Sequence, residues 1–424
     1  MSHKNVILLT IDALRADHLS CHGYGRQTSP TLDRLASEHL QCDKAISASS
    51  HTREAVPALL TGQYPCDAVD ESYALATDSI ATHLSETPYA TGAFHSNPYA
   101  SRAYGFDKGF DHFYDDLYFG GNKAIALLQG VLNKFRDHLY ATAEQINERA
   151  LDWLDSQSRP VFVWNHYMDV HGPYKPPTTY RGLFSDQAKT NSNPKKLYER
   201  AAVTDPEGIT PAERQELVNR YDEEIRYVDD SIDDFLSSLR EGGYLEDALL
   251  IITADHGEAF GESNFYGHPR YLTDELVHVP MIASLPSESA DSLDVPVSTL
   301  DVAPTILKHV GVTDFEGPGT PLQTLARHPN QFRDRRVFST ARGENEHSNR
   351  RRFSVRTTHG QCFLERNRTT GQVLSVRTKG EESSLETELR EFSGMKLSEE
   401  TAEGRERETL SNEVERRLEG LGYK

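Results

Sequence analysis

Three short apolar segments, far apart in the chain, each lead into polar side chains, and this pattern narrows the folds that the chain can adopt. The segments cover residues 6–11, 161–164 and 248–253. Nearly continuous apolar runs of this length are typical of strands that are buried on both faces. Asp12 follows the first run directly, and Asp255 follows the third run. The sequence therefore predicts buried strands with carboxylates at their ends.

The clearest helix signal lies between the second and third of these strands. Thr210 and Glu213 form a capping box with Pro211 at the first helical position, and apolar residues recur at steps of three and four up to Gly242. Buried strands separated by such helices predict an α/β fold, layered α/β/α with a largely parallel central sheet. Ligands bind such sheets at the carboxyl ends of the strands. The polar strand ends are therefore expected to share one site.

The composition along the chain suggests a large unit, 1–330, followed by a smaller C-terminal unit, 331–424. Within the first unit, the polar stretch 178–209 is expected to form a lid insertion or a disordered loop. Residues 317–336, rich in Gly, Pro and Arg, are expected to form a linker, and 337–376 alternates as a small antiparallel sheet would. A short amphipathic tail helix is expected around Val414, Leu418 and Leu421.

Two strand ends supply side chains that suit a divalent cation. Asp12, Asp255 and His256 offer two carboxylates and one imidazole. Such a mixture of oxygen and nitrogen ligands suits Zn or Mn, whereas Ca or Mg prefers oxygen alone. A single Asp after a strand is often only a helix N-cap, but an Asp-His-Gly sequence there is harder to explain structurally. We expect one divalent metal ion, whose identity the sequence leaves open.

Thr52 stands where a helix is expected to begin. That helix should start just after Thr52 and end at Gly62, and Pro57 is tolerable only in its first turn. The hydroxyl has two readings: a plain N-cap, which the sequence alone favours, or a nucleophile activated by the metal. Negative charge is favoured at such a helix start, so an anionic substrate group would also suit the position.

Histidines cluster near two of the predicted strand ends. His166 and His171 follow the second strand, and His268 lies twelve residues after His256. A single histidine is more often structural, but two so close together at a sheet edge favour chemistry. Either could hold an oxyanion or protonate a leaving group. The candidate substrate-binding residues are Arg53, Asn97 and Arg270.

Charge and composition exclude several classes of partner. With 65 acidic against 45 basic residues, the chain has a net charge of −20, which disfavours nucleic acid and anionic membrane surfaces. An acidic, Lys-poor chain is expected of a halophilic protein or of an ordinary acidic cytoplasmic enzyme. Its four cysteines form no disulfide framework, and it holds no apolar run long enough for a signal peptide or a membrane span. We therefore expect a soluble cytoplasmic protein, of unspecified oligomeric state.

Six segments together resemble the sulfatase family, which belongs to the alkaline phosphatase superfamily. In order along the chain they are 5–19 (NVILLTIDALRADHL), 51–65 (HTREAVPALLTGQYP), 166–177 (HYMDVHGPYKPP), 253–258 (TADHGE), 272–282 (LTDELVHVPMI) and 297–307 (VSTLDVAPTIL). The resemblance implies an alkaline phosphatase-like fold and a metal-dependent ester hydrolase. It is specific for the family and much less so for the substrate.

The resemblance also implies roles for individual residues. One metal ion would be held by Asp12, Asp255 and His256. Thr52 falls at the nucleophile position, where its oxygen would also contact the metal. His171 matches the family's histidine near the transferred group, and His268 falls where many members have a lysine.

The sequence departs from sulfatases proper at several of these positions. Those enzymes have Cys or Ser at the position of Thr52, which is oxidised to formylglycine, and Arg at the position of Val56. Threonine cannot become formylglycine. Ala13 replaces the second Asp of the usual pair, and His256 stands where many sulfatases have Asn. This pattern is more similar to the single-metal phosphoglycerol and phosphoethanolamine transferases and to the nucleotide phosphodiesterases.

The leading expectation is a metal-dependent, sulfatase-like hydrolase that cleaves sulfate or phosphate esters of a small molecule or glycan through Thr52. A phosphodiesterase or a phosphoglycerol- or phosphoethanolamine-type transferase is the first alternative. The others are a catalytically silent family member and a phosphomutase-type enzyme, although the latter usually needs two full metal sites.

Overall fold

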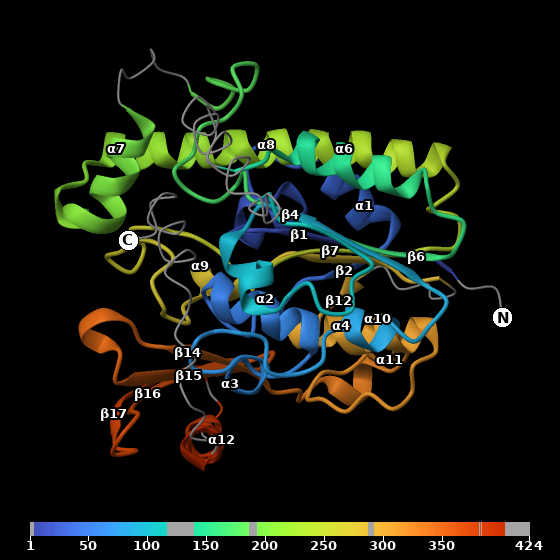
Figure 1. Ribbon diagram of the computed structural model, residues 1–424. Coiled ribbons are helices and arrows are strands. Elements are labelled where there is room, and N and C mark those ends of the chain that lie inside the picture. The colour runs from blue at the N-terminus through green and yellow to red at the C-terminus, as the bar shows by residue number, and fades with distance from the viewer. Residues whose placement is uncertain are drawn as a thin grey trace, which may run out of the picture.

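The computed structural model describes residues 4–116, 140–185, 193–286, 292–380, 382 and 384–402. Its centre is an eight-stranded sheet (Figure 1) in the order β12-β2-β11-β7-β1-β6-β4-β5. The strands are β12 (Ser292–Leu293), β2 (Leu40–Cys42), β11 (Met281–Ser284), β7 (Leu249–Ala254), β1 (Val6–Ile11), β6 (Val161–Tyr167), β4 (Ala90–His95) and β5 (His112–Tyr114). Only β11 runs antiparallel to its neighbours, so the predicted, largely parallel sheet is confirmed.

Helices cover both faces of this sheet, which confirms the layered α/β/α arrangement (Figure 1). One face carries α1 (Pro30–Glu38), α6 (Ala143–Leu154) and α8 (Pro211–Glu241). The other carries α2 (Thr52–Thr61), α4 (Ile80–Leu84), α10 (Val302–Val310) and α11 (Leu322–Arg327). The predicted capping box of Thr210 and Glu213 opens α8, and its apolar stripe is buried. In the part of the chain that the structure describes, no helix has the length and apolarity needed to cross a membrane.

A second, antiparallel sheet follows in the chain and confirms the prediction for 337–376. It consists of β14 (Val337–Arg342), β15 (Arg350–Arg356), β16 (Gly360–Asn367) and β17 (Val373–Gly380). Helix α12 (Leu385–Ala402), which the sequence analysis did not predict, packs on this sheet. The expected tail helix around Val414 lies outside the described residues.

Smaller elements lie around the two sheets. The strands among them are β3 (Ala45–Ile46), β8 (Ala259–Phe260), β9 (Tyr266–Gly267), β10 (His278–Val279) and β13 (Val297–Ser298), and the short helices are α3 (Pro65–Ala68), α7 (Pro194–Glu199) and α9 (Asp274–Val277). Strands β10, β3 and β13 form one small sheet and β8 pairs with β9.

Three local expectations need correction. Pro57 lies in the second turn of α2, and the helix continues because the packing of its residues outweighs the lost hydrogen bond. The expected linker 317–336 contains α11, because Leu322 and Leu325 are buried against the core. In 178–209, buried Leu197 and Ala201 anchor α7 and the turn after it; residues 186–192 lie outside the description.

The central strands bring the predicted site residues to one edge. β1 lies between β7 and β6, and Ile11 is level with Ala254 on one side and Tyr167 on the other. Asp12 and Asp255 therefore follow the ends of neighbouring parallel strands, at the same edge of the sheet. His166, expected after its strand, is instead a residue of β6, which runs three residues further than predicted because it pairs with both β1 and β4.

Candidate active site

Asp12 and Asp255 form a completely buried pair of carboxylates. Asp255 Oδ1 accepts hydrogen bonds from the backbone N–H groups of Ala13 (3.2 Å) and His256 (2.9 Å), and Asp12 Oδ2 accepts one from Asn97 Nδ2 (2.8 Å). Among the described residues, Asp12 Oδ1 and Asp255 Oδ2 have no hydrogen-bond partner. Two unpartnered, buried carboxylate oxygens are costly unless a cation lies between them.

The imidazole of His256 turns a third acceptor toward the same place. Its Nδ1 lies 2.8 Å from the carbonyl oxygen of Gly257, which can only accept, so Nδ1 carries the proton. Nε2 therefore presents a lone pair, 3.5 Å from Asp12 Oδ1 and 3.6 Å from Asp255 Oδ2. This donor set fits one divalent cation, as the sequence predicts, and its mixed chemistry suits Zn or Mn.

Glycine is required directly after this histidine. A Cβ at Gly257 would collide with the carbonyl oxygen of Glu275. The close approach fixes the backbone that carries Asp255 and His256, which explains the Asp-His-Gly sequence physically.

The two carboxyl groups have opposite pKa shifts in the protein without a cation. Burial and the neighbouring Asp12 raise the pKa of Asp255. Burial would raise the pKa of Asp12 as well, but the hydrogen bond with His166 and the surrounding imidazoles hold it below its ordinary value. Because like charges this close do not ionise independently, and because a cation favours the ionised carboxylates, cation binding is expected to release protons from the pair.

The hydroxyl of Thr52 faces this acceptor cluster. Its Oγ1 lies 3.1 Å from His256 Nε2 and 3.3 Å from Asp12 Oδ2. The N-cap of α2 is His51, whose Nδ1 accepts the N–H of Arg53 at 3.2 Å, and Thr52 is the first helical residue. The reading of Thr52 as a plain N-cap is therefore wrong, and the four predicted metal-site residues do converge.

His166 lies beneath Asp12 and is completely buried. Its Nε2 is 3.2 Å from Asp12 Oδ2, and its Nδ1 is 2.8 Å from Thr10 Oγ1. Potential ligand atoms of His166, Asp12 and Asp255 all lie within 4.8 Å of one another. This placement suits a residue that holds Asp12 or joins the metal ligands.

The rings of His171 and His268 pack against each other, tilted by 57°, beside the metal-site residues. Their ring centroids are 4.7 Å apart, and the ring of His268 is 4.8 Å from that of His256. Burial lowers the pKa of His171. Burial would lower the pKa of His268 as well. The carboxylate of Glu258, which lies 3.2 Å from His268 Nδ1, has the larger effect and raises the pKa of His268. His268 is thus the imidazole that most readily carries positive charge.

The three candidate substrate-binding residues have different surroundings. Asn97 donates to Asp12 and to Met168 Sδ (3.1 Å), so it contacts the metal-site carboxylate. The Arg53 guanidinium lies 4.1 Å over the ring of Tyr99, and no described residue accepts a hydrogen bond from its buried Nε. Arg270 is already paired with Glu54.

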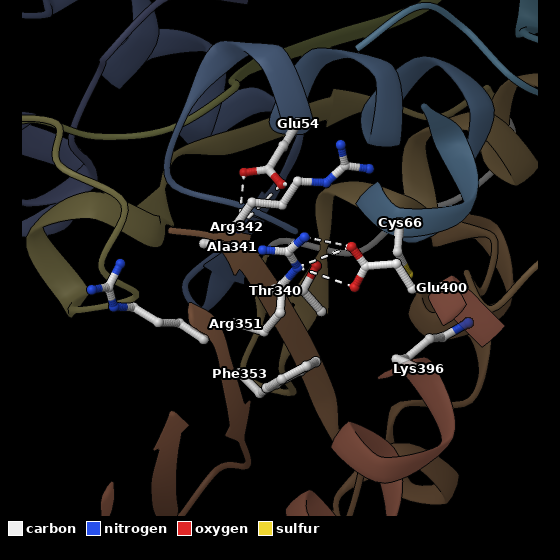
Figure 2. A pocket seen from close by; sticks show the side chains of 10 residues that line it. Glu54, Cys66, Thr340, Ala341, Arg342, Arg351, Phe353, Lys396 and Glu400 are labelled. Atoms are coloured by element: carbon white, nitrogen blue, oxygen red, sulfur yellow. Dashed lines mark hydrogen bonds and ion pairs between the residues drawn. The ribbon is translucent and has the colours of Figure 1, made fainter. Parts of the chain in front are cut away.

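Arg270 belongs to a buried ion-pair network that the sequence analysis did not predict. It donates to Glu54 at 2.8 Å and to Glu344 at 3.2 Å. Glu54 also accepts the backbone N–H of Arg342 at 3.2 Å, where α2 meets β14 (Figure 2). No sequence signal marks Glu54. Glu258, by contrast, closes the TADHGE segment and could have been noted there.

Comparison with known proteins identifies a family of similar chains. The family model described as Sulfatase matches residues 4–312. The chain is 23% identical over 353 residues to the uncharacterized sulfatase YidJ of Escherichia coli K12, covering 75% of this chain and 69% of that protein. It is 21% identical over 449 residues to an N-acetylglucosamine-6-O-sulfatase of Bacteroides thetaiotaomicron, covering 83% and 77%.

Two further similar proteins are not named as sulfatases. The phosphoethanolamine transferase EptA of Helicobacter pylori is 23% identical over 293 residues, covering 66% of this chain and 47% of that protein. The crystal structure of a phosphonate monoester hydrolase of Agrobacterium radiobacter superposes with a TM-score of 0.70 at 18% identity, covering 94% and 96% of the two chains. At this identity, the superposition shows a shared fold.

Proposed function

The chain belongs to the sulfatase family, and its relatives include an N-acetylglucosamine-6-O-sulfatase. We propose that it is a metal-dependent hydrolase of sulfate or phosphate esters with Thr52 as its nucleophile. The convergence of Thr52 Oγ1, two unpartnered carboxylate oxygens and the lone pair of His256 carries this proposal. The buried hydroxyl contacts two of the residues that would hold the metal, His256 and Asp12.

The metal would be held by Asp12, Asp255 and His256. When bound, it would polarise the ester and lower the pKa of the Thr52 hydroxyl. Asn97 and His166 would keep Asp12 oriented through their contacts with its Oδ2.

Thr52 and the neighbouring histidines would carry out the displacement. The Thr52 oxygen forms a bond to sulfur or phosphorus as the bond to the leaving alcohol breaks, and water then releases the acid and restores the hydroxyl. His268, whose pKa the Glu258 carboxylate raises, would neutralise charge on the non-bridging oxygens, and the ring of His171 lies beside it. Arg53, which follows Thr52 in the chain, would add a further positive charge.

We rank sulfate esters first and phosphate esters second. The family and the relatives named as sulfatases favour sulfate. Threonine has no route to formylglycine, so a sulfated Thr52 would have to be hydrolysed directly, and this favours a phosphoryl substrate. Both classes present a tetrahedral anion to the site, although a sulfate ester carries less negative charge than a phosphate monoester.

Transfer of a phosphoryl-containing group to an alcohol is the second candidate function. The combination of Thr52 with Asp255-His256, and the similarity to a phosphoethanolamine transferase, favour it. The two functions differ only in whether water or an alcohol takes the group from Thr52, so product analysis with added alcohol distinguishes them.

An assay of metal-loaded protein on an aryl sulfate, a phosphate monoester and a phosphodiester tests the proposal. Thr52→Ala is expected to lower turnover by about a thousand-fold or more on the preferred ester. Thr61→Ala, in the same helix and equally buried, serves as the matched control and should keep its activity. Full turnover by Thr52→Ala would overturn the proposed nucleophile.

A further inference from the structure

His51 directly precedes the proposed nucleophile and is the N-cap of α2. Helices favour Ser, Thr, Asp or Asn at this position, because a short side chain with an acceptor atom reaches the N–H groups of the first turn. The histidine meets the same need with one ring nitrogen, Nδ1, which accepts the N–H of Arg53 at 3.2 Å. Its second ring nitrogen, Nε2, is not needed for capping.

The capping hydrogen bond determines which nitrogen of His51 carries a proton. Because Nδ1 accepts a hydrogen bond from a backbone N–H, it holds no proton, and the neutral ring therefore has its proton on Nε2. In the part of the chain that the structure describes, no residue accepts a hydrogen bond from Nε2. The start of α2 thus holds a neutral imidazole with one unused donor.

The ring of His51 borders the space beside the Thr52 hydroxyl. Its centroid lies 6.3 Å from that of His256, whose Nε2 is 3.1 Å from Thr52 Oγ1. The ring of His268 is 5.5 Å from that of His51. Since Nδ1 of His51 faces the first turn of α2, its Nε2 points away from the helix. An anion held at Thr52 would lie among these three imidazoles.

The ring of Tyr99 restricts the orientation of His51. Tyr99 is buried, and the two ring centroids are 5.8 Å apart. Tyr99 is itself anchored, because the guanidinium of Arg53 lies 4.1 Å over its ring and its backbone N–H donates to Asn97 Oδ1 at 2.8 Å. A donor that is oriented before the reaction begins costs no reorganisation when charge develops beside it.

Building on the proposed function, we propose that His51 is a further catalytic residue. Its Nε2–H donates a hydrogen bond to a non-bridging oxygen of the sulfuryl or phosphoryl group as this group passes to Thr52. His51 keeps its proton throughout, because losing it would leave an imidazolate. A neutral imidazole at a helix N-terminus can act as a donor of this kind.

Asn and Gln at position 51 replace the two ring nitrogens separately. His51→Asn keeps an acceptor for the N–H of Arg53 but has no donor at the place of Nε2, whereas His51→Gln puts an amide N–H near that place. In the full, metal-loaded chain we expect His51→Asn to lower kcat on the preferred aryl ester about a hundred-fold. KM should change about two-fold at most, and the midpoint of urea unfolding should stay the same.

His51→Gln should recover about a ten-fold part of the lost kcat, because it restores a donor. The matched control is His309→Asn, which changes a histidine at the end of α10 and should keep the full kcat. An unchanged kcat in His51→Asn would overturn the assignment. A loss of kcat that accompanies a lower urea midpoint would also overturn it, since His51 would then act only as a cap. In either case the proposed function stands as long as Thr52→Ala is inactive.

Binding of vanadate tests the assignment without turnover. Vanadate bound to a hydroxyl adopts the trigonal-bipyramidal shape of the group in transfer, whereas inorganic phosphate stays tetrahedral. By calorimetry on the metal-loaded protein, His51→Asn should raise the Kd of vanadate about ten-fold or more and the Kd of phosphate by a smaller factor. An unchanged Kd for vanadate, or an equal rise for both anions, would overturn the assignment whether or not the wild type cleaves esters.

Discussion

At the scale of single residues, existing hydrogen bonds decide which oxygens of the two carboxylates face a cation. Asn97 and His166 occupy Asp12 Oδ2, and backbone N–H groups occupy Asp255 Oδ1. Asp12 Oδ1, Asp255 Oδ2 and His256 Nε2 remain directed at one another. Ala13, with φ +60°, supplies one of those N–H groups from a left-handed conformation that costs a non-glycine residue free energy.

The Glu258–His268 pair gives a prediction for the pH dependence. Because the Glu258 carboxylate raises the pKa of His268, the active protonated form persists to higher pH and is lost as the pH rises through that raised pKa. Glu258→Gln removes this effect, so the alkaline limb of the kcat/KM profile should move to lower pH. Glu262→Gln, a carboxylate nearby in sequence that pairs with Arg15, should leave the limb in place. An alkaline limb that Glu258→Gln does not move would contradict the role of His268.

At the scale of elements, α2 is held in place by the buried network around Glu54. Glu54 lies two residues after Thr52 and connects α2 to Arg270, two residues beyond His268, and to β14. The network therefore joins the nucleophile helix, the histidine loop and the smaller sheet.

Breaking this network should cost both stability and activity. Glu54 and Arg270 are 1% and 2% exposed, and removing one partner of a buried ion pair costs about 3 kcal/mol or more. We expect Glu54→Gln to lower the free energy of unfolding in urea by about that amount and to reduce kcat. Asp233→Asn breaks the exposed pair with Arg34 and should cost less than about 1 kcal/mol. Equal losses from the two variants would contradict the anchoring role.

The elements that sequence predicts well are those with local signals. β1 and α8 carry their whole pattern in consecutive residues, and both were predicted within a residue or two. Helix α11 depends on the burial of two leucines in a Gly- and Pro-rich stretch, and α12 is stabilised by packing on the smaller sheet. Such elements depend on tertiary contacts, which propensity alone does not reveal.

At the scale of the whole molecule, the site is assembled from residues far apart in sequence. The positions of Asp12, Asp255 and His256 after predicted parallel strands identified them as site residues, since such strands end at the same edge of the sheet. The family resemblance supplied Thr52. The partners that orient these residues, such as Asn97 on Asp12 and Glu54 on Arg270, follow no local rule, so only the structure identifies their contacts.

The net charge of −20 predicts how stability responds to salt. Self-repulsion of a strongly acidic chain destabilises the folded state, and salt screens it. We expect Tm, measured at a fixed metal concentration, to rise by several degrees between about 0.1 M and about 1 M KCl. NaCl should produce the same rise if screening is the cause. An unchanged or falling Tm would contradict a fold whose stability is limited by charge repulsion.

The most direct test of the account is to trap the covalent intermediate on Thr52. Metal-loaded protein is mixed with an aryl ester, quenched in acid within the first turnover, digested and analysed by mass spectrometry. We predict that the peptide containing Thr52 gains the mass of one sulfuryl or phosphoryl group, and that this gain is lost when the quench is delayed until the ester is consumed. A transferred group found on another side chain, or a burst of released alcohol with Thr52 unmodified, would contradict it.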